Sequence, residues 1–571
     1  MRTSMSARSI FAALSLGACM GMWTIVSAMP PHPDLVNSEN PVIQRNLALY
    51  DSLRTISRPV MVDRPMYAGT GSPAVGTRKL LAILVQFADN DSAVAATYFD
   101  SLLFSHTTQS VRDYYDEVSY GQLSIDGPSQ PSAIGWRTAP QDYSYYVNGT
   151  YGTGSYPYNS QKLVEDLIEL IDDDVDFGQY DGDNDGVVDG IVVIHAGTGA
   201  ERSGSVNDMW SHMWSIWPPQ ARDGKIIRTY SIQPEYWAVP GDMTIGVFCH
   251  ELGHLLFNLQ DLYDYDDDSR GLGLWSLMAS GSWGGPLFEG DYPSHPDAWS
   301  RMQMGLVTPD VVTAAVEDQT IPAIENVPTA FRLWTDGSVI GDEYFLVENR
   351  QKTGYDAYLP GSGLCIYHVD ENVITGNDRQ WYPTYTTHGH YLVALEQADG
   401  TWDLERNVLY DYGDNGDPFP GSGGNRLFTA ASLPSSAAYS GAATYVVVAD
   451  ISNSGPTMTA DFNVTIGSGV VDEDGAAAPI SFTLGQNYPN PFNLSTQFEI
   501  TLPRAGDVDM GLYDVLGRKV RTICADYRES GTYIMTWDGT DDHGRPVPGG
   551  VYFSRVCYAG ETRTNKMVLL K

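Results

Sequence analysis

Basic residues are scarce in this 571-residue sequence. It holds 33 Lys and Arg against 71 Asp and Glu, which gives a formal net charge of −38. A surface of this sign repels the phosphates of DNA and RNA, so we expect no nucleic-acid partner. The surplus of carboxylates instead favours solubility and the binding of divalent cations.

Cysteine is too rare to form a disulfide scaffold. The sequence has 5 cysteines, and Cys19 belongs to an N-terminal stretch that we expect to be removed. Cys524 and Cys557 fall in one C-terminal module, where they could pair. Cys249 stands in an apolar stretch and is expected to pack as a small buried hydrophobe.

Long apolar runs are absent beyond the N-terminus, so no retained membrane span is predicted. Residues 1–28 instead have the pattern of a secretory signal peptide. Arg2 and Arg8 form its charged start, an apolar stretch extends to Val26, and small residues end at Ala28. We therefore expect a secreted protein that is cut after Ala28.

The length predicts several domains, and changes of composition suggest where they meet. Residues 29–76 are rich in Pro, then weakly helical, then rich in Gly, Ser and Pro, which indicates a pro-segment and linker; an ordinary N-terminal extension is the alternative. The other segments are an α/β domain with alternating strands and helices (77–310), a β-rich accessory domain (311–465), a linker (466–479) and an immunoglobulin-like β-sandwich (480–571).

An H-E-x-x-H motif in the α/β segment, residues 77–310, predicts a metal site and a catalytic domain. His250 and His254 are one helical turn apart, so their imidazoles share a face and can hold Zn²⁺. Glu251 is placed to act as general base on water. The flanking residues are apolar, as expected for a buried, rigid helix. The alternative is a buried amphipathic helix with two incidental histidines.

A catalytic zinc site usually has a third protein ligand, and two aspartates follow the motif. Asp261 lies seven residues after His254, and Asp264 lies ten after it. Further on, Met278 stands in the segment Trp275-Ser-Leu-Met-Ala-Ser-Gly281. This order is similar to that of metzincins, in which the chain turns sharply after the helix and a Met-containing turn lies beneath the metal. Three residues are candidate groups to stabilise the transition state: Tyr263, Tyr265 and His295.

An acidic loop between a predicted helix and a predicted strand suggests a second cation. Oxygen ligands recur at alternate positions, and a glycine is sixth, as in calcium loops. Closely spaced carboxylates repel one another without a cation. An Asp/Gly-rich turn is the alternative. The candidate calcium ligands are Asp181, Asp183, Asp185, the Val187 carbonyl and Asp189.

Several stretches within residues 77–465 resemble secreted zinc metallopeptidases of the immune inhibitor A family. The resemblance implies a metzincin-like zinc endopeptidase, often calcium-stabilised, with accessory β structure. The matching stretches are Leu81-Ala-Ile-Leu-Val-Gln-Phe-Ala-Asp89, Val111-Arg-Asp-Tyr-Tyr-Asp-Glu-Val-Ser-Tyr-Gly-Gln-Leu123, Cys249-His-Glu-Leu-Gly-His254, Asp261-Leu-Tyr-Asp264, Trp275-Ser-Leu-Met-Ala-Ser-Gly281, Tyr344-Phe-Leu-Val-Glu-Asn-Arg350 and Ile366-Tyr-His-Val-Asp-Glu371.

One departure from the metzincin spacing concerns the third ligand. The usual glycine is replaced by Phe257, and Asp261 comes one residue later than expected. Asn258 can supply the left-handed conformation that the turn requires. The Asp-Leu-Tyr-Asp context aligns Asp261 with the family's ligand, and Asp264 remains the alternative.

The last domain resembles the C-terminal sorting domain that the type IX secretion machinery of Gram-negative bacteria recognises. This resemblance implies transport across the outer membrane, then release or attachment to the bacterial cell surface; a plain accessory domain is the alternative. The matching stretches are Asn487-Tyr-Pro-Asn-Pro-Phe-Asn493, Leu512-Tyr-Asp-Val-Leu-Gly-Arg-Lys-Val520, Trp537-Asp-Gly539, Gly549-Gly-Val-Tyr-Phe553 and Lys566-Met-Val-Leu-Leu-Lys571.

Taken together, these features predict a secreted zinc endopeptidase that acts on proteins or peptides and is monomeric. Zn²⁺ would bind His250, His254 and Asp261, with Glu251 as general base and Met278 beneath the site. Two other functions stay open: a non-catalytic surface adhesin on a protease scaffold, and a zinc amidase acting on cell wall.

Overall fold

The computed structural model describes residues 27–570 except for short stretches. These are residues 39, 58–74, 108, 128–134, 266–268, 288, 340, 374–375, 378–389, 407–410, 466–481, 486, 488–489, 491, 494–495, 503–505, 529–530, 544 and 559–560. The predicted linker 466–479, most of the predicted signal peptide and most of the Gly/Ser/Pro-rich stretch before residue 76 lie outside the described residues. In the part of the chain that is described, no helix is long and apolar enough to cross a membrane.

A seven-stranded mixed sheet organises the first half of the chain. Its strand order is β1-β6-β7-β5-β2-β3, with β4 also paired to β2. Strands β2, β5 and β7 are parallel, whereas β6 runs antiparallel to β7, and β1 antiparallel to β6. The strands are β1 (Ser27–Ala28), β2 (Gly76–Gln86), β3 (Leu123–Asp126), β4 (Trp136–Thr138), β5 (Gly190–Thr198), β6 (His212–Arg222) and β7 (Lys225–Tyr236).

The central strand β2 is apolar because both faces of the sheet are covered. Leu80, Ala82 and Leu84 point into a core shared with α8, while Leu81 and Ile83 point into a core on the opposite face. The alternation of strands and helices that the sequence predicts is confirmed. The helices here are α1 (Pro33–Val36), α2 (Pro41–Ser57), α3 (Ala96–Phe104), α4 (Val111–Val118), α5 (Tyr143–Val147), α6 (Ser160–Ile171), η1 (Phe177–Tyr180), α7 (Ala200–Ser203) and α8 (Gly246–Phe257).

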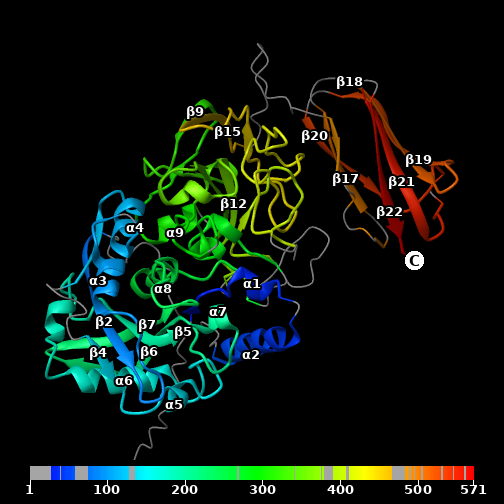
Figure 1. Cartoon of the computed structure of the whole chain (residues 1–571). Coiled ribbons are helices and arrows are strands. Elements are labelled where there is room, and N and C mark those ends of the chain that lie inside the picture. Colours follow the sequence, from blue (N-terminus) through cyan, green and yellow to red (C-terminus); the bar gives the residue numbers. More distant parts are fainter. Residues whose placement is uncertain are drawn as a thin grey trace, which may run out of the picture.

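A β-rich region follows on the side of α8 opposite the first sheet, and the two share a core (Figure 1). It holds a five-stranded sheet of order β13-β12-β11-β10-β8 and a three-stranded sheet of order β14-β15-β9. The strands are β8 (Asp310–Val311), β9 (Val316–Pro322), β10 (Phe331–Leu333), β11 (Glu343–Arg350), β12 (Gly363–Asp370), β13 (Val393–Leu395), β14 (Val447–Ala449) and β15 (Thr457–Asn463). Short helices around it are η2 (Gly273–Trp275), η3 (Ser280–Trp283), α9 (Ala298–Gln303), η4 (Thr335–Gly337) and η5 (Gly354–Tyr358).

The C-terminal strands form two further sheets, of order β16-β17-β20 and β19-β18-β21-β22, which share one core. The pairing of Cys524 with Cys557 that the sequence leaves open is not formed, since both thiols are free. Strand β18 lies between the strands that carry them. The strands are β16 (Thr483–Leu484), β17 (Thr496–Leu502), β18 (Gly506–Asp514), β19 (Lys519–Arg528), β20 (Gly531–Trp537), β21 (Gly550–Tyr558) and β22 (Glu561–Leu569).

Candidate metal centre

Helix α8 carries the H-E-x-x-H motif through the buried centre of the molecule. His250, Glu251 and His254 are all buried. The two glycines of this helix allow close packing: a Cβ at Gly246 would lie 1.9 Å from the Ser282 carbonyl oxygen, and one at Gly253 would lie 2.7 Å from Sδ of Met278. Met278 therefore packs directly against the helix that bears both histidines.

The turn that follows α8 brings the third candidate ligand back to the histidines. Asn258 ends the helix in the left-handed conformation, with φ 55° and ψ 34°, as the sequence predicts. Its N–H donates to the His254 carbonyl, and the N–H of Leu259 donates to that of Gly253. The chain then reverses, so that Asp261 faces His250 and His254.

Both histidines are fixed by a hydrogen bond from Nδ1, which leaves Nε2 available to bind a metal ion. Nδ1 of His250 donates to the Leu277 carbonyl at 2.9 Å, and Nδ1 of His254 donates to the Leu259 carbonyl at 2.8 Å. A carbonyl can only accept, so each Nε2 carries the lone pair. Burial lowers the pKa of His250, despite the opposing effect of Asp261, which favours the neutral imidazole that a metal requires.

The three candidate ligands converge on one point. Oδ1 of Asp261 lies 3.2 Å from Nε2 of His250 and 3.0 Å from Nε2 of His254, and the two Nε2 atoms are 3.1 Å apart. Ligand atoms around a tetrahedral Zn²⁺ at roughly 2.1 Å are about 3.4 Å apart, a little more than the distances found here, so the spacing and the donor set fit zinc.

Asp264, the alternative third ligand, lies outside this group. Its Oδ2 accepts a hydrogen bond from Ser269 at 2.7 Å, and it lines a small cavity with Pro30 and Tyr412. Asp261 instead accepts a hydrogen bond on Oδ2 from Tyr265, which leaves Oδ1 toward the histidines. The geometry thus favours Asp261.

His295, a candidate for transition-state stabilisation, is held in a buried cluster. Its Nε2 lies 2.8 Å from Oε1 of Glu117, and Nδ1 contacts the Arg301 guanidinium. Both ring nitrogens are therefore engaged away from the three ligands. Helix α9 begins after His295, with the Asp297 side chain as its N-cap.

A segment that the sequence does not connect with the site lies beside it. Ser27–Ala28 extend the sheet at the edge of β6, and residues 28–33 are buried. Three side chains donate hydrogen bonds to consecutive carbonyls: Tyr263 to Ala28 at 2.6 Å, Trp210 to Met29 at 2.8 Å and Trp283 to Pro30 at 3.2 Å. No periodic pattern marks this segment, so these contacts emerge only from the fold.

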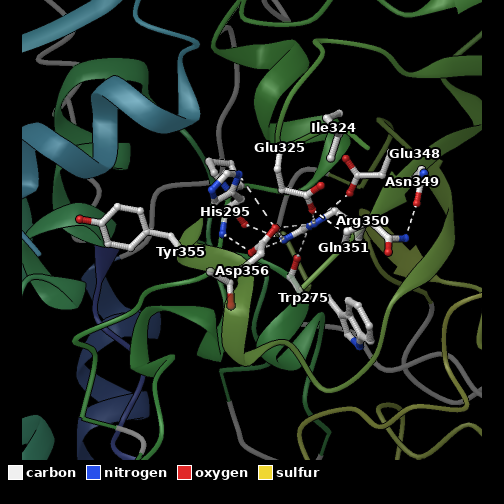
Figure 2. Close-up of polar contacts among 12 residues, drawn as sticks. Trp275, His295, Ile324, Glu325, Glu348, Asn349, Arg350, Gln351, Tyr355 and Asp356 are labelled. Atoms are coloured by element: carbon white, nitrogen blue, oxygen red, sulfur yellow. Dashed lines mark hydrogen bonds and ion pairs between the residues drawn. The ribbon is translucent and has the colours of Figure 1, made fainter. Parts of the chain in front are cut away.

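Sequence reasoning also missed a second set of residues, which lies next to His295. Figure 2 shows the Arg350 guanidinium between the carboxylates of Asp356 and Glu348, close to the Trp275 backbone. The stretch that ends at Arg350 is part of the family resemblance, but nothing in its pattern indicates a contact with the metal centre.

The acidic loop brings together three of its five candidate ligands. Asp181, Asp183 and Asp185 each place one oxygen within 4.8 Å of the others. Nζ of Lys225 lies 2.5 Å from Asp181, and Nη1 of Arg78 lies 3.4 Å from Asp183. Asp189 lies outside the group: its Oδ2 accepts hydrogen bonds from the N–H groups of Lys79 and Gly182. The N–H of Val187 donates to Asp185.

Comparison with known proteins relates two parts of the chain to families. Residues 70–307 match the immune inhibitor A peptidase M6 catalytic domain, and residues 492–561 match the FlgD Ig-like domain. The predicted resemblance to the immune inhibitor A family is thus confirmed, and the chain ends in an Ig-like domain.

Individual relatives agree with the first match. The chain is 27% identical over 279 residues to the pre-pro-metalloprotease PrtV of Vibrio cholerae serotype O1 (strain M66-2), covering 39% of this chain and 29% of that protein. It is 30% identical over 214 residues to immune inhibitor A of Bacillus thuringiensis subsp. alesti, covering 31% of this chain and 29% of that protein. The chain thus spans less than a third of the length of either relative.

Among solved structures, that of FlgD from P. aeruginosa is similar to part of the chain. It is 26% identical, covers 13% of this chain and 59% of that chain, and has a TM-score of 0.11.

Proposed function

We propose, on the premise that residues 70–307 are a peptidase M6 catalytic domain, that this protein is a secreted zinc endopeptidase. The observation that carries the proposal is the convergence of His250, His254 and Asp261 on one point, next to Glu251 on the same buried helix. The substrates would be proteins or peptides outside the cell.

The chain's own residues account for binding and proton transfer. His250, His254 and Asp261 would hold the ion, and their second hydrogen bonds keep them in place. The chemistry that zinc supplies when bound is polarisation of the scissile carbonyl and of water. Glu251 would accept the proton of the attacking water and give it to the leaving amine. Met278 supports α8 from below without binding the ion.

The N-terminal segment supports synthesis as a zymogen. Residues 28–33 are buried beside the site, and three side chains hold their backbone. Tyr263, one of these, also lies with its ring 6.3 Å from that of His250. A cut after Ala28 would remove the first of the three contacts, whereas Met29 and Pro30 would stay bound. Removal of the whole segment would then be needed to admit substrate.

Calcium is proposed for the acidic loop. Asp181, Asp183 and Asp185 supply three close oxygen ligands, and Ca²⁺ accepts six to eight. Lys225 and Arg78 now neutralise part of the same charge, so a bound ion would have to displace or rearrange them. Asp189 would join the site only after a change of its hydrogen bonds to Lys79 and Gly182.

We also propose that the Ig-like domain directs the protein to type IX secretion, with release or attachment at the cell surface. The support is the set of stretches between Asn487 and Lys571 that resemble the sorting domain. The catalytic part is proposed to act as a monomer.

The decisive experiment combines metal analysis with cleavage. The secreted protein, after removal of its N-terminal segment, is given casein and peptidoglycan, with and without a zinc chelator, beside a Glu251→Gln variant that keeps the size of the side chain. We expect bound zinc and cleavage of casein that is lost in the chelator and in the variant. Cleavage of peptidoglycan alone would favour the amidase, and bound zinc without any cleavage would favour the adhesin.

A further inference from the structure

The β-rich region shares a core with the metal centre rather than forming a separate body. Along β11 and β12, Tyr344, Leu346 and Tyr367 belong to the core that contains α8, whereas Phe345 and Ile366 belong to the core on the opposite face. The five-stranded sheet therefore has one face in the core that also contains the apolar residues of α8. Because protein interiors are closely packed, a displacement of that face is transmitted to the helix that bears the candidate ligands.

Arg350, at the end of β11, is the charged centre of this contact. Its side chain is completely buried, and so are those of its partners Glu348 and Asp356. Nε and Nη2 bind the two oxygens of Asp356 at 2.9 and 2.8 Å, and Nη1 lies 3.2 Å from Oε1 of Glu348. A buried pair of this kind keeps a fixed geometry, because separating it would leave an uncompensated charge in the interior.

The pair is connected to His250 by a short series of hydrogen bonds. Oδ1 of Asp356 accepts from the His295 N–H at 2.8 Å, and the His295 carbonyl accepts from the Leu277 N–H at 3.3 Å. The Leu277 carbonyl in turn accepts from Nδ1 of His250 at 2.9 Å. Nη1 of Arg350 also donates to the Trp275 carbonyl at 3.0 Å, two residues before Leu277 (Figure 2).

The same region also holds the backbone beside the third ligand. Nδ2 of Asn377, which is fully buried, donates to the Leu262 carbonyl at 3.0 Å and to the Val393 carbonyl in β13 at 2.8 Å. Its neighbour Gly376 is so close that a Cβ there would lie 2.3 Å from the Asp261 carbonyl oxygen. The backbone next to two candidate ligands, His250 and Asp261, is thus held by contacts with one β-rich region.

We propose that Arg350 and Asp356 are positioning residues of the metal centre, which set the orientation of His250 through the Trp275–Leu277 backbone. This inference rests on the proposed zinc peptidase function. It makes the β-rich region a necessary part of the catalytic unit, although the ligands and the general base all lie before residue 262.

The test compares substitutions in the pair with a matched substitution on the other face of the same sheet. Asp356→Asn keeps an acceptor for the His295 N–H but loses the charge that fixes Arg350. Arg350→Lys keeps the charge but loses the two-pronged contact. Ile366→Val serves as control, since it is equally buried but belongs to the far core.

Three properties are measured: the zinc dissociation constant and the visible spectrum after cobalt substitution on the full-length protein, and kcat with KM after removal of the N-terminal segment. We expect both variants to bind zinc about 10- to 100-fold more weakly, as for other residues behind metal ligands, with a changed cobalt spectrum and a lower kcat at similar KM. Ile366→Val should leave zinc affinity and spectrum unchanged. Folded variants with the zinc affinity and spectrum of the control would overturn the proposal.

If neither variant folds, the inference is tested on the unsubstituted protein, because the coupling between the Arg350–Asp356 pair and zinc must act in both directions. If the pair positions His250 for zinc, then zinc must also stabilise the connecting backbone. Removing zinc should accelerate amide exchange at Leu277 and His295 by about tenfold or more relative to amides in β18. Equal exchange would refute the inference. A protein that binds no zinc at all would instead refute the proposed function.

Discussion

The hydroxyl of Tyr265 donates a hydrogen bond across 2.9 Å to Oδ2 of Asp261, so that Oδ1 of the same carboxylate faces both histidines. A carboxylate held on one oxygen cannot rotate freely and presents the other at a fixed place. The phenol thus has the position of an outer partner to Asp261, the proposed third ligand.

Tyr265→Phe should weaken zinc binding by about tenfold without a large loss of stability, because it removes the hydroxyl that orients Asp261 and leaves the half-buried ring. The measurement is a chelator competition. Tyr263→Phe is the matched control, since the hydroxyl of Tyr263 donates to Ala28 rather than to a ligand. Equal zinc affinities of the two variants would contradict the assigned role.

Asp261→Asn and Asp264→Asn should differ in metal content. The first removes the negative charge of the carboxylate whose Oδ1 lies 3.0 Å from Nε2 of His254, so we expect less than about a tenth of the parent's zinc to survive dialysis. The second weakens a contact with Ser269 and should keep zinc. Elemental analysis of both proteins decides the matter, and the reverse result would make Asp264 the ligand.

Local features of the site were predictable from the sequence because they depend on short-range rules. The spacing of His250 and His254 fixes their common face on any helix. Because the usual glycine after the motif is missing, Asn258 is the residue there that most readily adopts a left-handed backbone conformation, and it does so. The apolar run near Leu80 required a strand covered on both faces.

Long-range contacts were not predictable, since no spacing rule encodes them. Nothing in the sequence around Arg350 indicates that it reaches Trp275, and nothing around Met29 indicates that Trp210 will hold it. Cys524 and Cys557 illustrate the same limit: they share a sheet, but an intervening strand separates them. Which residues meet across a core depends on the packing of whole elements.

Removal of the N-terminal segment should activate the enzyme. Limited proteolysis between residues 58 and 74 would detach the stretch whose Met29 and Pro30 carbonyls Trp210 and Trp283 hold beside the site. We expect peptide cleavage to increase by at least about tenfold, since each factor of ten corresponds to about 1.4 kcal/mol of segment binding. The rate is measured before and after the cut, with Glu251→Gln as blank. An unchanged rate would argue against latency.

Calcium should raise the melting temperature of the zinc-loaded protein. A ligand that binds only the folded state stabilises it by about 2.7 kcal/mol at about a hundred times its Kd, which is roughly 5–10 °C for a domain of this size. Asp183→Asn should abolish the shift, and Mg²⁺ should not reproduce it. Scanning calorimetry with each ion checks this. A shift that survives in the variant would place the ion elsewhere.

His368 should make the stability of the β-rich region dependent on pH. The ring is buried between two carboxylates, with Nδ1 3.2 Å from Glu396 and Nε2 3.0 Å from Glu343, and it stacks on Tyr439. Burial opposes the charge, but the two carboxylates outweigh it and raise the pKa of His368 above its usual 6.5. The uncharged ring of Phe345 also packs on the imidazole of His368, with the two ring centroids 4.3 Å apart.

The sign of the effect follows from this raised pKa. The folded state holds the proton more tightly than the unfolded state, so the stabilisation is complete below about pH 6.5 and is lost as the pH rises through the folded pKa. The substitution His368→Gln removes the ion pairs with the two carboxylates. It should lower the free energy of unfolding by about 1–3 kcal/mol at pH 6 and by much less at pH 9. Thermal unfolding of both proteins at the two pH values measures the difference, and the exposed His543 gives a control as His543→Gln. A His368→Gln penalty that is the same at both pH values would show that the imidazole is neutral between Glu343 and Glu396, because only a protonated ring makes the contact dependent on pH in this range.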